Sequence, residues 1–406
     1  MKTCGTHATR STRSGLHFGS VRWLGIMLVA WLGLSAACTA DLPEFDPRSL
    51  LVVISGQSNR DSRTTDSSSS SPTGGGTSVA SPLKSIQSGL INMSGQTINN
   101  VPIAAVDWTK AFSYCTYHLN TAQPQYIPIC RLSSNTNLEI KSFAAAPTSN
   151  VEYYVVEFQS GAYVTRGTQP IAAADTSVNI NPGYTFDLTK SFVLVETNAN
   201  SNLSSVDEQL TMTANLNGST NILLQRNENG TDLQLNWQVV QLDGASVQSL
   251  STNINAATSR SVAISSVNVD QSFVILNARA GGAANGNDAE WMTRARLTAN
   301  TVELNRGAST NQVDLQLYVV QLGGATVQQG TQTTPNAATT SMSAFPANSY
   351  TSSQAVPFIS TTVNSASQQH IEANWTSQIN TSQIDFIRVS SNVTSSIDWQ
   401  LVQFAQ

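Results

Sequence analysis

Apolar and polar residues alternate with a period of two along much of the chain beyond residue 84. Leu233-Gln-Leu-Asn-Trp-Gln-Val239 shows this pattern, and Val313-Asp-Leu-Gln-Leu-Tyr-Val319 repeats it. Successive side chains of a strand point to opposite faces, so the alternation predicts antiparallel β-strands with one buried and one solvent-exposed face. Turn residues such as Asn217-Gly218 separate the strands. The pattern predicts an all-β protein.

Three sequence features recur at nearly constant spacing. Apolar runs end at Phe158, Leu242, Leu322 and Phe404, which are 84, 80 and 82 residues apart. Asp107–Phe112, Asp187–Phe192 and Asn268–Phe273 precede the first three runs, and Ser352–Val356 is a degraded fourth copy. A basic residue stands 16 or 17 residues before the end of each run: Lys141, Arg226, Arg306 and Arg388. Three features in register predict four copies of one module.

We place the modules at residues 84–159, 160–243, 244–323 and 324–406. In the second copy we expect six strands, near Val164 and at 178–180, 192–196, 210–216, 222–226 and 233–242. About 80 residues with short strands suit a small antiparallel β-sandwich or barrel-like module. The junctions are short, so we expect a stiff tandem array in the form of a rod.

The recurring arginines have two candidate roles. Arg226, Arg306 and Arg388 follow apolar residues of the same strand parity, so each stands at the end of a core-facing row. The aliphatic stem can cover the rim of the core while the head meets a carboxylate or carbonyl, or the arginine can bind a ligand. Three copies favour the structural role, with Asp187 as a candidate partner of Arg226.

The N-terminus has the pattern of an export signal. Residues 23–37 form an apolar run behind a basic segment, too short to span a bilayer easily and closed by small residues, so residues 1–37 are expected to be a signal peptide. Leu34-Ser-Ala-Ala-Cys38 resembles the lipobox of bacterial lipoproteins, which implies that the mature chain begins at an acylated Cys38 at the cell envelope or surface. Cleavage after Ala37 or Ala40 and an uncleaved anchor are the alternatives.

Residues 38–83 are expected to form a disordered tether. The segment is low in complexity, with Ser67–Ser71 and Gly74–Gly76, and cannot bury enough apolar area to offset the entropy of ordering it. Within it, Leu51–Asn59 is similar to the first block of SGNH-type esterases, in which Ser58 would be the nucleophile. The Asp-x-x-His block of that family is missing from this sequence. Without its base the serine is not activated.

The charge content excludes one class of partner. Charged residues make up 11% of the 406 residues, less than half of the usual ~25%, and the formal net charge is −5. Nucleic acid is excluded because binding it requires concentrated Lys and Arg. The surface must instead be rich in hydroxyl and amide groups. No catalytic constellation or cluster of metal ligands stands out, so we expect neither enzyme activity nor a cofactor.

The first module holds the candidate site residues. Cys115 and Cys130 lie on strands expected to be neighbours, and an oxidising compartment favours a disulfide over free thiols or a metal site. Tyr114, Tyr117, Tyr126 and Tyr154 are candidates for an aromatic binding face. His118 is expected at the surface. In the third module, Asn285–Glu290 has oxygen ligands at loop spacing for calcium but lacks the full acidic pattern, which favours an ordinary polar loop.

These features predict a non-enzymatic, surface-tethered β-repeat protein with an adhesive or structural role at the bacterial cell envelope, where weak contacts add through multivalency. A carbohydrate-binding protein is the alternative, with one site per module or one in the tyrosine-rich first module. A secreted hydrolase is a distant third. The expected partners are the membrane, through the lipid, and a glycan or protein surface. The sequence leaves the oligomeric state open.

Overall fold

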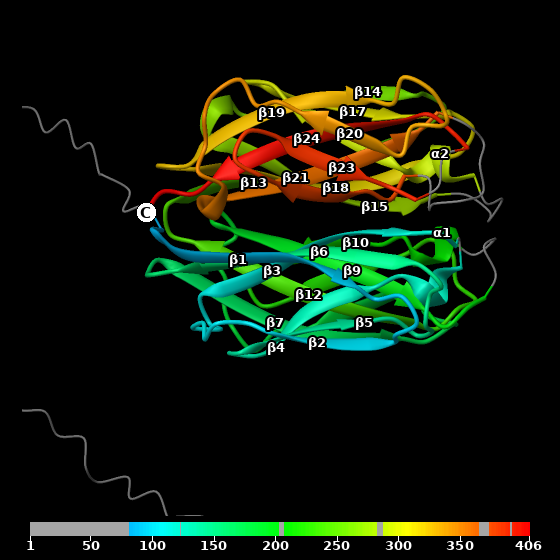
Figure 1. Ribbon diagram of the computed structural model, residues 1–406, viewed down its shortest axis with the longest axis horizontal. Helices are drawn as coiled ribbons and strands as arrows, with labels where there is room; N and C mark the ends of the chain where they lie inside the picture. Colours follow the sequence, from blue (N-terminus) through cyan, green and yellow to red (C-terminus); the bar gives the residue numbers. More distant parts are fainter. Residues whose placement is uncertain (1–80, 122, 203–206, 282–286, 365–372, 390–391) are drawn as a thin grey trace, which may run out of the picture. The chain divides into compact units, whose positions relative to one another are not determined.

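In the computed structural model the first strand, β1 (Leu83–Asn92), begins at the end of the expected tether (Figure 1). The structure describes residues 81–121, 123–202, 207–281, 287–364, 373–389 and 392–406. The signal sequence, Cys38, Ser58 and most of the tether lie outside the described residues. In the described part of the chain, no helix is long and apolar enough to cross a membrane.

Residues 83–158 form two three-stranded antiparallel sheets. In the first, with the order β1-β6-β3, β6 (Ser149–Phe158) lies between β1 and β3 (Ala111–Leu119). In the second, with the order β2-β5-β4, β5 (Asn137–Lys141) lies between β2 (Ile98–Pro102) and β4 (Ile129–Ser134). A 3-10 helix, η1 (Pro124–Tyr126), connects β3 to β4.

This strand order recurs three times among the described residues, in β7–β12, β13–β18 and β19–β24. We call the four sets of six strands groups 1 to 4. Group 2 contains β7 (Ala162–Ile171), β8 (Ser177–Ile180), β9 (Ser191–Ala199), α1 (Asp207–Leu210), β10 (Thr213–Leu216), β11 (Ile222–Gln225) and β12 (Leu233–Leu242). Group 3 contains β13 (Ala245–Ile254), β14 (Ser259–Ala263), η3 (Val269–Gln271), β15 (Ser272–Ala280), α2 (Asp288–Trp291), β16 (Thr293–Leu297), β17 (Thr301–Arg306) and β18 (Val313–Leu322). Group 4 contains β19 (Thr326–Thr333), β20 (Ser341–Ala344), η4 (Ser352–Gln354), β21 (Ala355–Val363), β22 (Thr376–Ile379), β23 (Ile384–Ile387) and β24 (Ser395–Gln403). The predicted all-β class and antiparallel pairing are confirmed.

The sixth strand of each group is mostly buried on both faces, so the expected solvent-exposed face is wrong for these strands. In β12, Gln238 is 5% exposed, and in β24, Gln400 is 3% exposed. The carboxamide of Gln238 bonds both the N–H and the C=O of Ser113 in β3, and Gln400 does the same to Val274 in β15. A buried amide must have hydrogen-bond partners. These glutamines therefore link one group to another.

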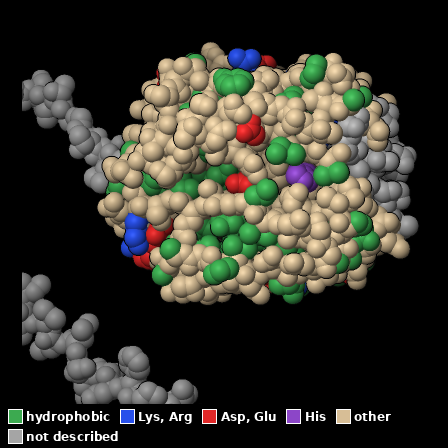
Figure 2. All heavy atoms as spheres, viewed as in Figure 1, with side chains coloured by type: hydrophobic (Ala, Val, Ile, Leu, Met, Phe, Trp, Pro, Cys, Tyr) green, Lys and Arg blue, Asp and Glu red, His purple; other side chains and the backbone are tan. Residues whose placement is uncertain are grey.

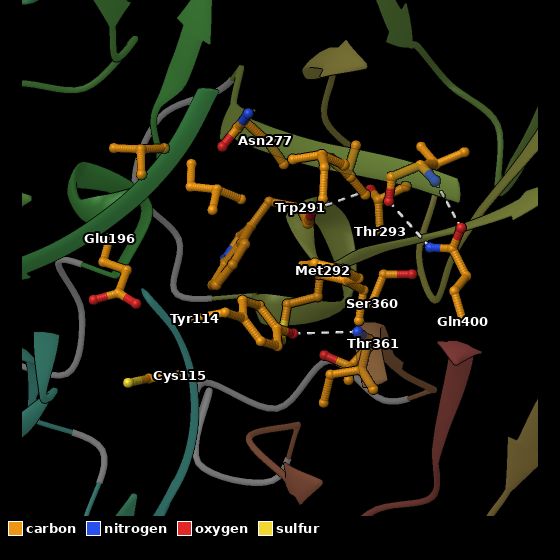
Figure 3. Close-up of a pocket in the computed structure, with 18 of the residues that line it drawn as sticks. Tyr114, Cys115, Glu196, Asn277, Trp291, Met292, Thr293, Ser360, Thr361 and Gln400 are labelled. Carbon is orange, nitrogen blue, oxygen red and sulfur yellow. Dashed lines mark hydrogen bonds between the residues drawn. The ribbon is translucent and has the colours of Figure 1, made fainter. Parts of the chain in front are cut away.

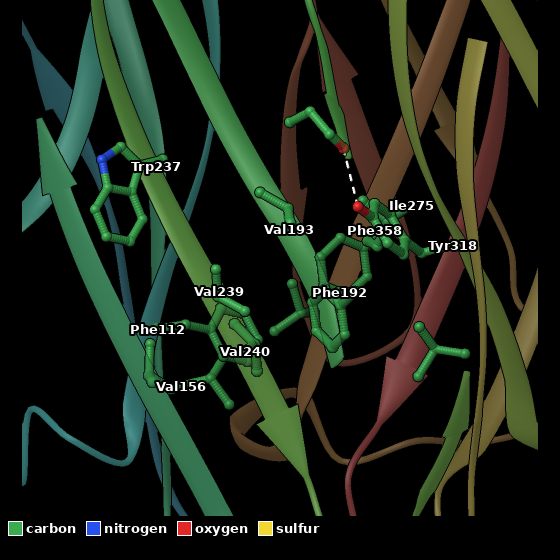
Figure 4. Close-up of a cluster of buried hydrophobic side chains, with 14 of the residues drawn as sticks. Phe112, Val156, Phe192, Val193, Trp237, Val239, Val240, Ile275, Tyr318 and Phe358 are labelled. Atoms are coloured by element: carbon green, nitrogen blue, oxygen red, sulfur yellow. Dashed lines mark hydrogen bonds between the residues drawn. The ribbon is translucent and has the colours of Figure 1, made fainter. Parts of the chain in front are cut away.

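Neighbouring apolar residues of a sixth strand belong to different cores. Val155 packs in a cluster formed by group 1 alone, whereas Val156 packs in a cluster with residues from all four groups. Figure 4 shows Phe192 and Phe358 in this shared core. The rings of Phe192 and Phe273 lie 6.1 Å apart, and those of Phe273 and Phe358 5.3 Å apart. Phe112 of group 1 lies 6.5 Å from Phe192, so all four groups meet in one aromatic contact chain.

Groups 1 and 4 also contact each other, so the expected rod, in which only consecutive modules touch, is wrong. The N–H of Leu83 donates to the carbonyl of Ala405 over 2.6 Å, and the rings of Phe158 and Phe404 lie 5.5 Å apart. All described residues belong to one compact unit, Gly74–Gln406. The reason is the second apolar face of the sixth strands, which is buried only when the groups face one another.

The recurring arginines bind backbone carbonyls. Arg226 is 1% exposed and donates at 2.7 to 3.2 Å to the carbonyls of four residues, Ala172, Ala173, Asp175 and Thr231. Arg306 and Arg388 also donate to carbonyls. The predicted structural role is confirmed. Asp187 is the wrong partner for Arg226, because its carboxylate accepts from Thr189 instead.

Candidate functional site

The interior shared by the four groups changes from apolar to polar along the third strands. The apolar end holds Phe112, Phe192, Phe273 and Val356, each paired in register with a valine of the sixth strand. Four residues further on stand Thr116, Glu196, Asn277 and Ser360, paired with Glu152, Asn236, Gln316 and Asp398. We call these eight residues the polar layer. It places hydrogen-bonding side chains from each of the four groups at one level of the interior.

The polar layer is only partly satisfied by protein contacts. Asp398 accepts from Arg294 over 2.9 Å and from Thr331 over 2.5 Å. The other carboxylate oxygen of Asp398, the amide nitrogen of Asn277 and one carboxyl oxygen of Glu152 have no hydrogen-bond partner among the described residues. Buried polar groups without partners are uncommon, so a bound molecule or water would stabilise them.

A cavity of about 300 Å³ lies beside the polar layer (Figure 3). Tyr114 of β3, Glu196 of β9, Asn277 of β15 and Ser360 of β21 all line it, so each group contributes a wall. Trp291 of α2 lies between Asn277 and Tyr114 in the view, and its indole nitrogen has no partner among the described residues. A second cavity, of about 250 Å³, shares Asn277 and Trp291. The two cavities can accept a small molecule with oxygen acceptors.

Glu196 is the carboxyl group that faces the cavity. Its Oε2 accepts a 2.5 Å hydrogen bond from the backbone N–H of Cys130 in β4, so it connects groups 2 and 1. Burial raises the pKa of Glu196 to about 8, because protein replaces the water that would stabilise the charge, and the bond from Cys130 acts in the opposite direction. At neutral pH the carboxyl is therefore mostly protonated.

Replacing Glu196 with glutamine should weaken the loss of stability that occurs as pH rises from about 4.5 to about 8. Between the ordinary pKa of 4.5 and the folded value of about 8, the folded state keeps a proton that the unfolded chain has lost. Its contribution to the free energy of unfolding is complete below the lower value and falls by up to about 1.4 kcal/mol per pH unit as pH rises. Urea unfolding across this range should show that the free energy of unfolding of the variant increases relative to that of the wild type as pH rises. A pH-independent difference would contradict a neutral Glu196.

The predicted disulfide is confirmed. Cys115 of β3 and Cys130 of β4 are bonded, with their Cα atoms 6.5 Å apart. The Sγ of Cys130 also lies 3.4 Å from Oε1 of Glu196, which brings both sulfurs and one carboxylate oxygen within 4.8 Å of one another. Free thiols and a metal site were the alternatives for this pair. In the bonded state the sulfurs are not thiolate ligands, so the group is a disulfide beside an acid.

The tyrosines expected to form a binding face lie mainly inside the molecule. Tyr154 is 2% exposed and donates to the carbonyl of Ser377 over 2.7 Å. Tyr114 accepts from the N–H of Ile359, and burial raises the pKa of its hydroxyl. Tyr117 lines the second cavity, and Tyr126 packs partly buried against the shared core. A role of these tyrosines in binding stays a prediction.

Two other expectations concern polar residues near this end of the strands. His118 is 4% exposed, so its expected surface position is wrong; Nε2 lies 2.8 Å from the Asn150 amide, and burial lowers the pKa of the ring. In the loop Asn285–Glu290, residues 285 and 286 lie outside the described residues. Glu290 belongs to α2, is 5% exposed and accepts from Asn287. The ordinary polar loop favoured by the sequence stays a prediction, with calcium binding as its alternative.

Sequence analysis missed Glu196, Asn277, Trp291 and Ser360 as site residues. A signal for three of them was present, because Glu196, Asn277 and Ser360 stand four residues after the first inward-facing residue of their strands, at the same place in each copy. Trp291 lies in α2, outside the register of the strands, so this signal did not mark it.

No known protein family matches this sequence, and a search of curated proteins found no significant similarity.

Proposed function

We propose that the chain is a non-enzymatic, surface-tethered protein with an adhesive or structural role at the bacterial cell envelope. In this proposal, residues 1–37 are a signal peptide and residues 38–83 a tether anchored through a lipid on Cys38. Four copies of one β-sandwich module follow, at 84–159, 160–243, 244–323 and 324–406. The recurrence of one strand order in all four groups is the observation that carries the proposal.

Each group presents one strand of its second sheet to solvent. Asn100 of β2, Asn179 of β8, Ser261 of β14 and Ser341 of β20 are exposed. The face shown in Figure 2 carries few charged side chains among many uncharged ones. Hydroxyl and amide groups make weak hydrogen bonds to neutral partners, and four such sheets on one compact unit add these contacts through multivalency.

Replacing Cys38 with serine should release the protein from the membrane and reduce the attachment of cells that express it. The thiol is the group that would be acylated, so its loss removes the anchor but leaves the folded part unchanged. Cell fractionation and counting of attached cells measure the two effects. Cys4→Ser is the matched control, because Cys4 lies in the expected signal peptide.

Two results would count against this proposal. Unchanged processing and membrane retention of Cys38→Ser would contradict the lipid anchor. Release of the protein with undiminished attachment would contradict the adhesive role.

Carbohydrate binding is the second candidate, and the cavity beside the polar layer favours it. Trp291 and Tyr114 offer aromatic surface, while Asn277, Glu196 and Ser360 offer polar atoms, a combination that suits a sugar ring. A glycan array probed with the mature chain tests this candidate. Asn277→Ala should remove binding and Asn100→Ala should retain it. Equal binding by both variants would place the sugar elsewhere.

A further inference from the structure

The two sulfurs of the disulfide differ in their access to the cavity. Cys130 is 1% exposed, whereas Cys115 is partly exposed and lines the 300 Å³ cavity. Cys115 also lines a further cavity of about 190 Å³. Of the two cysteines, Cys115 is therefore the one that borders both cavities, while Cys130 is covered by protein.

An acid stands beside the covered sulfur. Oε1 of Glu196 is 3.4 Å from Sγ of Cys130, and the bond from the Cys130 N–H to Oε2 fixes the carboxyl in this position. The neighbouring strand β3 carries the titratable groups Tyr114, Tyr117 and His118, and burial and the charge of Glu196 raise the pKa of the Tyr114 hydroxyl. On β4, Arg131 is paired with Glu139 at 2.8 Å. Since burial keeps Glu196 protonated at neutral pH, a proton is available where a leaving thiolate would form.

We propose that the Cys115–Cys130 disulfide is an exchangeable bond, at which a small thiol becomes attached to Cys115 while Glu196 donates a proton to Cys130. The incoming thiol loses its proton to solvent and its thiolate attacks Sγ of Cys115. The bond between Cys115 and Cys130 breaks, and Cys130 leaves with the electron pair and takes the proton from Glu196. The products are a mixed disulfide on Cys115, a thiol on Cys130 and a carboxylate on Glu196, which regains its proton from solvent. A second molecule of the thiol, attacking the attached one, completes reduction of the protein and is itself oxidised to a disulfide.

The cavity indicates the kind of thiol. Leu194, Ile275, Met292 and Phe358 supply apolar walls, and Glu196 is neutral in the state that reacts. A small uncharged thiol fits these surroundings better than a large or charged one, because burying a charge there has no compensating partner. The site is thus one of reversible thiol modification, separate from the adhesive role proposed above.

The reduction rate of the folded protein by 2-mercaptoethanol tests the role of Glu196. Acid quenching followed by intact-mass analysis counts the attached thiol. Glu196→Gln keeps an acceptor for the Cys130 N–H but has no acidic proton, so reduction should be at least tenfold slower. Glu152→Gln is the matched control, since Glu152 is the carboxyl of group 1 in the polar layer, and its rate should stay within about twofold of wild type. Equal rates for all three proteins would overturn the proposal.

Single cysteine variants test the access of each sulfur without depending on Glu196. In Cys130→Ser, the remaining Cys115 thiol should react readily with iodoacetamide, whereas in Cys115→Ser the Cys130 thiol should be protected until the protein unfolds. For each thiol, the rate of reduction of the wild type is divided by its rate with a model disulfide. This ratio should be lower for glutathione than for 2-mercaptoethanol, because glutathione is larger and charged. Faster alkylation of Cys130 than of Cys115 would overturn the proposed point of attack.

Discussion

Replacing Phe273 with alanine should destabilise all four groups together. The side chain is 1% exposed and contacts Phe192 of group 2 and Phe358 of group 4. Loss of a buried phenylalanine costs about 3 to 5 kcal/mol, from the lost transfer energy and the cavity left behind. Because the cavity opens in the core that the groups share, the thermal transition should move to lower temperature and stay single.

Hydrogen exchange measured on peptides from each group distinguishes global from local unfolding. Phe273→Ala should accelerate exchange of the most protected amides in every group by a similar factor. Phe345→Ala is the control: Phe345 is 69% exposed, and its loss should change stability by less than about 0.5 kcal/mol. Faster exchange in group 3 alone, or a split transition, would show that each group holds its own core and unfolds by itself.

The strands could be predicted from the sequence because each has a local signal. In group 2 the expected strands at 178–180, 192–196, 222–226 and 233–242 overlap β8, β9, β11 and β12. The strand expected from residue 210 begins later, because Asp207–Leu210 form α1. Alternation and turn residues act over a few positions, so they report local structure well.

The contacts between groups could not be predicted in the same way. Alternation shows which residues share a face, but it does not show whether that face meets water or another group. Gln238 and Gln400 therefore had the pattern of exposed residues, although each bonds the backbone of a neighbouring group. A second pattern was informative: the equivalent position holds Tyr154 and Tyr318 in the odd copies and these glutamines in the even ones. Such alternation indicates that the copies have unequal neighbours.

The candidate site depends on those contacts, which is why sequence analysis found only part of it. The disulfide was predicted because its cysteines belong to adjacent strands of one copy. Glu196 belongs to group 2 and reaches Cys130 only through the packing of groups 1 and 2. The same packing explains why Tyr154, expected at a binding surface, instead bonds Ser377 of group 4. Residues brought together by the shared core carry no common signal within a single repeat.

Replacing Arg226 with methionine should cost about 3 to 5 kcal/mol, although methionine retains much of the buried aliphatic stem. The guanidinium donates to four backbone carbonyls, and removing it leaves these acceptors buried without their partner. Burial lowers the pKa of Arg226, whereas the negative charges of Asp175 and Asp232 raise it. The arginine thus acts as a cross-link between the turn after β7 and the turn before β12.

Urea unfolding of three variants separates the cross-link from simple packing. Arg226→Lys keeps the charge but has a single nitrogen that cannot reach all four carbonyls, so its loss of stability should lie between those of wild type and Arg226→Met. Arg260→Met is the matched control, because Arg260 is exposed on β14 and its replacement should change stability by less than about 0.5 kcal/mol. A cost below about 1 kcal/mol for Arg226→Met would mean that the carbonyls find water once the guanidinium is gone. The recurring basic residue would then stabilise the fold because its aliphatic stem packs over the rim of the core, and its hydrogen bonds would contribute little.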